Sequence, residues 1–366
     1  MPPADPLPAG DDTPGRSGPD QRALATVALR ARIRALTGGG IEVGADSVDP
    51  AVVGHVAGDR AFYQASSVRG LGPALRWAMS NEVATLDLIA EAAVAGDLAR
   101  RAGHLVADGD DLPAITVWSA DGPQVVPAEP SPLDPPPPLP PGHQRFASVV
   151  AESGARPVDD HGILVAEVAG LEVARVVDGD DLVAGGQIAG VDADDRTHLA
   201  GPQLAVGVGQ ADRELQDYLH GHLDDDTNLR RAIAAVVRHR NPGSAAHPLS
   251  RLSRQRWLRS VLLDDPSLVG LDELEPVPPL RPPVTLLSQE PVAARGSGAV
   301  VVCSVGVDLD LLPEAADYRH RDDPDAELIV VVPERDRRLV AGPLEAAVPR
   351  LDLRSIDAPW DQPGPR

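Results

Sequence analysis

The 366-residue chain contains no lysine, so all 33 of its basic residues are arginines. The absence of lysine removes the side chain that metal-dependent nucleases use to activate water or to stabilise developing charge. It also excludes the lysine-containing phosphate loop G-x-x-x-x-G-K-[ST]. Alanine, glycine, proline and aspartate are abundant, a composition typical of GC-rich coding bias. A single arginine in this chain is therefore weak evidence of phosphate recognition.

Cysteine, aromatic residues and long apolar runs are also scarce. The single cysteine, Cys303, excludes an intramolecular disulfide and any zinc-finger spacing. No apolar run approaches the roughly 18–20 residues that span a bilayer, and residues 1–21 lack the hydrophobic core of a signal peptide. We therefore predict a cytoplasmic protein with no membrane partner. Because aromatic residues make up only 2%, we expect cores of Ala, Val and Leu anchored by Trp77, Trp118 and Trp257.

The length and composition favour two folded domains separated by a linker. The linker is PAEPSPLDPPPPLPPG, residues 127–142, whose prolines favour a stiff polyproline II spacer; a ligand of SH3 or WW domains is the alternative. We predict an N-terminal α/β domain at 21–126 and a C-terminal α/β domain at 143–357 with a helical arginine-rich insertion at 225–264. Residues 1–20 and 358–366 are predicted to be disordered tails.

Hydrophobic periodicity predicts an α/β fold with two small mixed-sheet domains. In the first domain we expect helices at 22–36, 71–81 and up to 101, and strands at 41–44, 52–57, 60–65, 85–91, 114–118 and 124–126. In the second we expect strands at 163–168, 171–177, 204–208, 299–304, 327–332 and 351–355, and helices at 144–152, 212–220, 227–239, 254–263 and 311–318. Residues 60–91 and 299–334 read alike, as strand, helix and strand. Duplication of one fold and chance similarity of two β-α-β units both explain this.

The arginine-rich segment, residues 230–259, is the strongest functional signal in the sequence. It contains eight arginines, two histidines and one tryptophan but no Asp or Glu, in a chain of formal net charge −22 whose remainder therefore carries about −30. An aromatic ring among arginines can stack on an exposed base while the guanidinium groups bind phosphate. In the alternative interpretation, Trp257 lies on a buried helix face and the arginines pair with the protein's own carboxylates. The candidate nucleic-acid-binding residues are Arg230, Arg231, Arg238, Arg251, Arg254, Arg256, Trp257 and Arg259.

Three further groups offer weaker candidates. Glu167, Glu172, Asp212 and Glu214 could form a divalent-metal site, but strand alternation predicts that Glu172 and Arg175 face opposite sides and cannot meet, and helix capping by the acids is favoured. His220 and His222, followed by three aspartates at 224–226, supply metal-ligand types without a fixed geometry. The stretch 303–310 could start an anion-binding helix, but Asp308 and Asp310 would repel phosphate, and Cys303 is expected to be buried.

The strings GVGQADRE, HPLSRLSRQRWLR and VVVCSVGVDLDLLPEAAD resemble an uncharacterised family of conserved actinobacterial proteins. At the level of fold, the order helix, three strands, helix, strand in residues 22–91 is similar to the core of restriction-endonuclease-like and tRNA-endonuclease-like domains. Active members carry acids on the second and third strands and a lysine beside the last. The corresponding segments here, VVGHVA and RAFYQASS, have none of these residues. The resemblance therefore implies an inactive copy kept for binding or assembly.

Two functions of different classes follow from these observations. The first is a non-catalytic, nucleic-acid-associated protein that binds through residues 230–259. The second is a structural or protein-interaction protein whose arginines are satisfied internally, and a divalent-metal nuclease is a weaker third possibility. We predict no catalytic residue, no bound metal and no cofactor. Burial or exposure of Trp257 separates the first two functions.

Overall fold

The computed structural model describes residues 19–44, 47–49, 52–106, 112–178, 201–210, 212–213, 224–245, 247–282, 287, 289–340 and 342–362. The protein has an α/β fold, and its backbone groups into two compact units. Unit 1 comprises Met1–Ala102 with Leu112–Ser131, and unit 2 comprises Gly103–Asp111 with Pro132–Arg366. Among the described residues, no helix has the length and apolar character that crossing a membrane requires.

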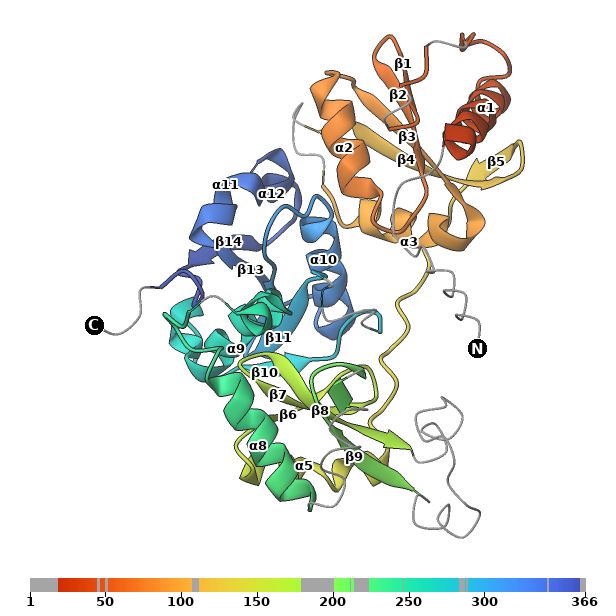
Figure 1. The fold of residues 1–366 in the computed structure, drawn as a ribbon. Helices are drawn as coiled ribbons and strands as arrows, with labels where there is room; N and C mark the ends of the chain where they lie inside the picture. The colour runs from red at the N-terminus through yellow and green to blue at the C-terminus, as the bar shows by residue number, and fades with distance from the viewer. Residues whose placement is uncertain are drawn as a thin grey trace, which may run out of the picture. The chain divides into compact units, whose positions relative to one another are not determined.

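Unit 1 contains one five-stranded sheet of order β1-β2-β3-β4-β5 (Figure 1). Strands β2, β3 and β4 are parallel, and β1 and β5 pair antiparallel at the two edges. Parallel neighbours require crossover connections, which helices α2 and α3 supply. The elements are α1 (Pro19–Leu36), β1 (Gly54–Ala57), β2 (Arg60–Ala65), α2 (Leu71–Ser80), β3 (Thr85–Glu91), α3 (Ala92–Gly103), β4 (Ala114–Asp121) and β5 (Gln124–Pro127).

Unit 2 contains two sheets. The first is antiparallel, of order β6-β7-β8-β9, and helices α5 and α8 pack against it (Figure 1). Leu229 and Val236 of α8 bury against a core of Val, Leu and Ala side chains from these strands. The elements are α4 (Pro141–Gln144), α5 (Ala147–Glu152), β6 (Arg156–Asp159), β7 (Leu164–Val168), β8 (Leu171–Asp178), β9 (Pro202–Val206) and α8 (Asp225–Val237).

The second sheet of unit 2 is mixed and has the order β10-β11-β12-β13-β14. Helix α10 packs on one face of β12 and β13 and helix α9 on the other, so the strands are buried on both sides. The elements are η2 (Pro248–Arg251), α9 (Arg254–Asp264), η3 (Pro266–Val269), β10 (Glu275–Val277), β11 (Val292–Gly296), β12 (Ala299–Cys303), α10 (Leu311–Asp322), β13 (Glu327–Pro333), η4 (Glu334–Asp336), α11 (Arg337–Val340), α12 (Pro343–Ala347) and β14 (Leu351–Ile356).

The similarity predicted between residues 60–91 and 299–334 extends to the topology of the two five-stranded sheets. In unit 1 a hairpin, β1–β2, leads through α2 to parallel β3 and then through α3 to parallel β4. In unit 2 the hairpin β11–β12 leads through α10 to parallel β13 and then through α11 and α12 to parallel β14. The two sheets therefore share one connectivity over four strands and the two helical crossovers that link them.

Several predicted elements require correction. Residues 41–44 are described and form no strand, so among the described residues two strands rather than three precede α2. Strands β6, β10 and β11 were not predicted, and the C-terminal region holds two sheets rather than one. The start of the C-terminal tail is ordered: Ala358 is buried and Trp360 packs on Trp257. Residues 1–18 and 363–366 lie outside the described residues.

Candidate functional site at a buried arginine–carboxylate cluster

The arginine-rich segment divides into an exposed part and a buried part. Arg230, Arg231, Arg238 and Arg251 are exposed, and Arg254 is half-buried. The side chains of α9 behave differently, because this helix lies between the two sheets of unit 2. Arg256, Trp257 and Arg259 are buried, with 9%, 3% and 2% of their surface exposed. These three residues, which the sequence suggested as nucleic-acid contacts, present no free surface to a nucleic acid in this structure.

Arg256 and Arg259 bind carboxylates of the antiparallel sheet. Arg259 donates to both oxygens of Glu167 on β7, at 3.0 and 2.9 Å. Arg256 donates to Glu167 at 3.0 Å and to Asp160, in the β6–β7 turn, at 2.9 Å. Burial alone would raise the pKa of Glu167, but Arg259 and Arg256 outweigh burial and hold the pKa below its ordinary value. Glu167 is therefore an ionised carboxylate neutralised by two arginines.

Glu172 on β8 lies directly opposite Glu167 in the hairpin register and has its own pair of arginines. Arg175 donates to its two oxygens at 2.7 and 2.8 Å, and Arg213 donates at 2.9 Å. The bond to Glu172 raises the pKa of Arg175. Two buried like charges on facing residues would repel strongly, and four guanidinium groups offset this repulsion. We call Asp160, Glu167, Glu172, Arg175, Arg213, Arg256 and Arg259 the ionic cluster.

The contact between Glu172 and Arg175 corrects the prediction that these residues cannot meet. In the register of β7 and β8, Ala166 pairs with Ala174 but Glu167 pairs with Glu172, so one residue of β8 is unpaired. Such a β-bulge shifts the alternation of side chains by one position. Residues three apart in β8 then share a face, which a regular strand does not allow.

Arg240 joins the tip of the β7–β8 hairpin to the start of α9. It donates to the carbonyls of Ala169, Leu249 and Leu252 at 2.7–3.1 Å, and its guanidinium lies 4.4 Å from the centre of the Trp257 ring. Burial lowers the pKa of Arg240 to about 9, so it remains a cation at neutral pH. Sequence reasoning did not single out Arg240, because its ligands are backbone carbonyls distant in sequence.

The stack that begins at Arg240 contains two neighbouring indoles with a cation at each end. The Trp257 and Trp360 rings lie 5.6 Å apart, and Arg254 lies 5.0 Å from the Trp360 ring. Trp257 therefore stacks among arginines, as the sequence suggested, but its partners belong to the protein itself. Guanidinium–indole contacts of this kind contribute up to about 2 kcal/mol each when desolvated. The role of Trp360 was missed because it follows a Pro- and Asp-containing stretch that resembles a tail.

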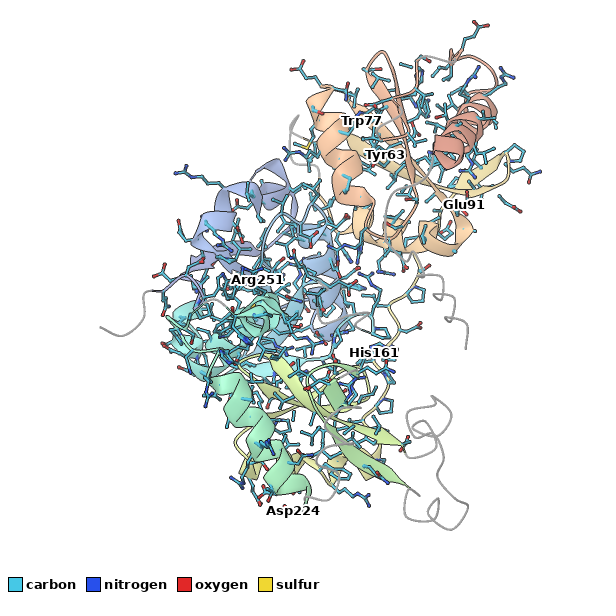
Figure 2. All side chains as sticks on the ribbon, in the orientation of Figure 1. Tyr63, Trp77, Glu91, His161, Asp224 and Arg251 are labelled. Atoms are coloured by element: carbon cyan, nitrogen blue, oxygen red, sulfur yellow. The ribbon has the colours of Figure 1, made fainter. Side chains whose placement is uncertain are left out.

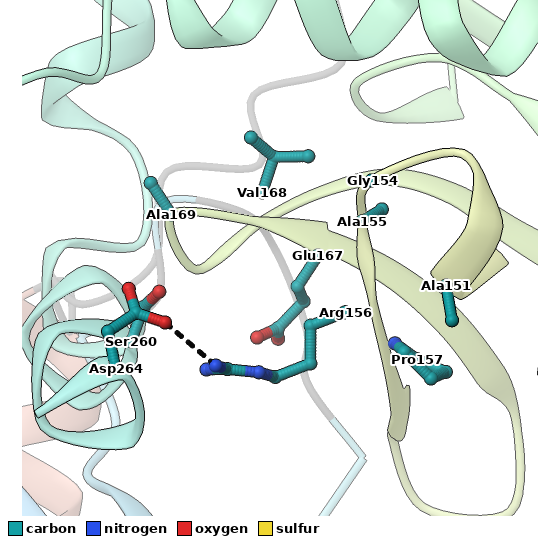
Figure 3. Close-up of a pocket in the computed structure, with 10 residues that line it drawn as sticks. All are labelled: Ala151, Gly154, Ala155, Arg156, Pro157, Glu167, Val168, Ala169, Ser260 and Asp264. Atoms are coloured by element: carbon teal, nitrogen blue, oxygen red, sulfur yellow. Dashed lines mark hydrogen bonds and ion pairs between the residues drawn. The ribbon is translucent and has the colours of Figure 1, made fainter. Parts of the chain in front are cut away.

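A shallow pocket of about 460 Å³ borders the ionic cluster (Figure 3). Arg156 and Asp264 form an ion pair of 2.8 Å across it, and Ser260 of α9 lines its wall. Glu167 faces the pocket, but its oxygens are engaged by Arg256 and Arg259. The pocket therefore lacks a free carboxylate for proton transfer or metal binding.

The candidate metal and anion sites are not assembled among the described residues. No group of three His, Cys, Asp or Glu side chains in the described part could hold a metal ion. Asp212 accepts the backbone amide of Val208 at 2.7 Å, while Glu214, His220 and His222 lie outside the described residues. Asp224 caps α8 by accepting the amide of Thr227 at 2.9 Å.

The acids Asp226 and Asp308 have local hydrogen-bond partners, and the cysteine is buried. Asp226 pairs with Arg230 and Ser153. Asp308 accepts the amide of Asp310 at 3.1 Å. Cys303 is fully buried, as expected, and burial raises the pKa of its thiol to about 12, so it is not a thiolate nucleophile at neutral pH.

Comparison with known proteins gives no further guide to the site. A scan against protein-family models, a search of curated proteins and a search of solved structures each found no match to the chain.

Proposed function

We propose that this chain is a non-enzymatic protein-interaction protein in which the arginine-rich segment holds the two sheets of unit 2 together. The observation that carries this proposal is the burial of Arg256 and Arg259 against Glu167. The two arginines that lie nearest to Trp257 in the sequence therefore form ion pairs inside the protein. Arg259 also donates to Ala293 of β11 at 3.4 Å, so one side chain contacts both sheets. The carboxylates best suited to a metal site, Glu167 and Glu172, are likewise committed.

The same burial counts against the nucleic-acid-associated function inferred from the arginine count. Of the exposed arginines, Arg230 pairs with Asp226 at 2.9 Å and donates to the Glu152 carbonyl. The tryptophan proposed to stack on a base is covered.

Substitution of a buried and an exposed arginine tests the internal role. In Arg256→Met, Asp160 loses its counter-charge and Glu167 keeps only one arginine, so we expect the free energy of unfolding to fall by roughly 3–5 kcal/mol. Arg251→Met, at an exposed position of the same segment, should change it by less than about 0.5 kcal/mol. Chemical denaturation monitored by circular dichroism measures both values. Equal effects of the two substitutions would contradict the proposed role.

A mobility-shift titration with single-stranded DNA, duplex DNA and RNA at about 50 mM salt tests the competing function. We expect no retardation of any of the three. Retardation that weakens steeply with added salt would indicate phosphate contacts and would overturn the proposal.

A further inference from the structure

A cationic surface remains on unit 2 after the buried arginines are accounted for. It comprises Arg238 and His239 at the end of α8, His247 and Arg251 on the turn η2, and Arg254 at the start of α9; Arg251 is labelled in Figure 2. The rings of His239 and His247 stack with centroids 3.7 Å apart and planes inclined by 10°, which joins α8 to η2. We call these five residues the cationic surface.

The cations of this surface repel one another rather than pairing with acids. Among the described residues, neither Arg238 nor Arg251 forms an ion pair. Burial, and then the charge of Arg335, lower the pKa of Arg254; the charge of Asp361 partly opposes this lowering, and the charge of Arg251 adds to it. Arg335 itself pairs with Asp361 at 3.0 Å. Unpaired like charges on one face repel one another, and an anionic partner would relieve this repulsion.

The size and chemistry of the surface favour a short acidic peptide over a nucleic acid. It offers three guanidinium groups and no free indole, because Arg254 covers Trp360 and Trp257 is buried, and its two histidine rings stack on each other. Nucleic-acid binding depends on many phosphate contacts along an extended charged strand, together with base stacking on exposed rings. A few carboxylates match three guanidinium forks in number and in bidentate geometry.

We infer that the cationic surface docks a short acidic segment of a partner protein. This inference rests on the proposed protein-interaction function and specifies its site and the chemistry of its partner. Carboxylates of the segment pair with Arg238 and Arg251, which lie on either side of the histidine stack in the chain. Arg254 is held by Ser250 at 3.1 Å and supplies a fixed third charge.

Fluorescence anisotropy with a labelled deca-glutamate peptide at about 20 mM salt tests this inference in the full-length protein. The unaltered chain should bind, and Arg238→Glu and Arg251→Glu should each weaken binding by about threefold to tenfold. Arg76→Glu is the matched control, since Arg76 is exposed on α2 and its reversal changes the net charge equally. All three variants should keep the melting temperature of the unaltered protein, which circular dichroism checks.

The outcomes separate this inference from the proposed function. No peptide binding, or equal weakening by Arg76→Glu and Arg251→Glu, overturns the docking site while leaving a protein-interaction function in place. Tighter binding of a ten-nucleotide DNA than of deca-glutamate, lost in Arg251→Glu, overturns both. Lowering the pH from 7.5 to 5.5 should strengthen peptide binding, because protonation of His239 adds charge to the surface while glutamates stay largely ionised. Binding that weakens over this range also overturns the docking site.

Discussion

At the scale of single residues, the tip of the β7–β8 hairpin shows how closely α9 is packed. The two-residue turn at Ala169 and Gly170 has positive φ angles of 46° and 72°, as a tight hairpin turn requires. A Cβ atom on Gly170 would lie 2.2 Å from the carbonyl carbon and oxygen of Arg256. Glycine is therefore required at this position for two reasons: the backbone has a positive φ angle, and the backbone of α9 leaves no space for a Cβ atom.

Gly170→Ala and Gly298→Ala separate these two requirements. Gly298, in the β11–β12 hairpin, has a φ of 69° but nothing within 4 Å of an added Cβ atom. Alanine there should cost about 1 kcal/mol of conformational strain. At Gly170 the helix must also move, so we expect a loss above about 3 kcal/mol. Equal losses in urea denaturation would show that the contact with α9 is unimportant.

At the level of residues, the sequence predicted that Cys303 is buried and offered a buried Trp257 as one of two alternatives, because apolar periodicity indicates burial directly. It failed for Arg240, Asp160 and the meeting of Glu172 with Arg175. The first two depend on partners about 10 to 100 positions away, and the third depends on a bulge. Strand alternation assumes regular pairing, and one extra residue in a strand reverses the face on which the following side chains lie. The sequence does not show where such a bulge occurs.

At the scale of elements, the stack of His239 on His247 connects the end of α8 to η2. Burial, then His247 and Arg238, lower the pKa of His239 below its ordinary value of 6.5. A histidine whose pKa is lower in the folded state is neutral there at neutral pH. Its contribution to stability is present above the unfolded pKa and is lost as the pH falls from that value through the lower folded pKa.

Acidification should therefore destabilise this junction. We expect the melting temperature to fall between pH 7 and pH 5.5, because protons bind the unfolded chain more tightly at His239 than the folded one. His239→Phe keeps a ring that can stack but cannot titrate, so its melting temperature should change less over the same range. Differential scanning calorimetry at each pH makes the comparison, and identical pH profiles would count against the explanation.

Elements with strong local patterns were predicted well, and the others were not. Strands β2 and β3 have the predicted bounds, since buried apolar residues make up most of both. Strands β6, β10 and β11 are short or interrupted by Pro, Arg and Gly, and pairing with neighbouring strands stabilises them. Sequence periodicity does not report such pairing.

At the scale of the whole molecule, α9 makes the two sheets of unit 2 interdependent. Its Leu258 and Leu262 bury in the core of the mixed sheet, and its Arg256 and Arg259 bind the antiparallel sheet. Removing a charge of the ionic cluster at the antiparallel sheet should therefore also destabilise the mixed sheet. This is the internal role that we propose for the arginine-rich segment: it couples the stability of one sheet to that of the other.

Hydrogen exchange in Glu167→Gln tests this interdependence. Removing the charge leaves Arg256 and Arg259 incompletely paired, so amides of β7 should exchange faster. We expect amides of β12, which carries no member of the ionic cluster, to exchange faster by a similar factor. Faster exchange confined to β7 would show that the two sheets open independently. Mass spectrometry of peptides from the two strands resolves the difference.

The tilted contact between Trp257 and Trp360 has a spectroscopic consequence. Two indoles 5.6 Å apart with planes inclined by 53° couple their electronic transitions, and such a pair gives a signed couplet in the ultraviolet circular dichroism spectrum. Trp257 lies in the first turn of the helix that joins the sheets, and Trp360 lies after the last strand. The couplet therefore provides a label-free signal for closure of the chain's C-terminal end onto α9.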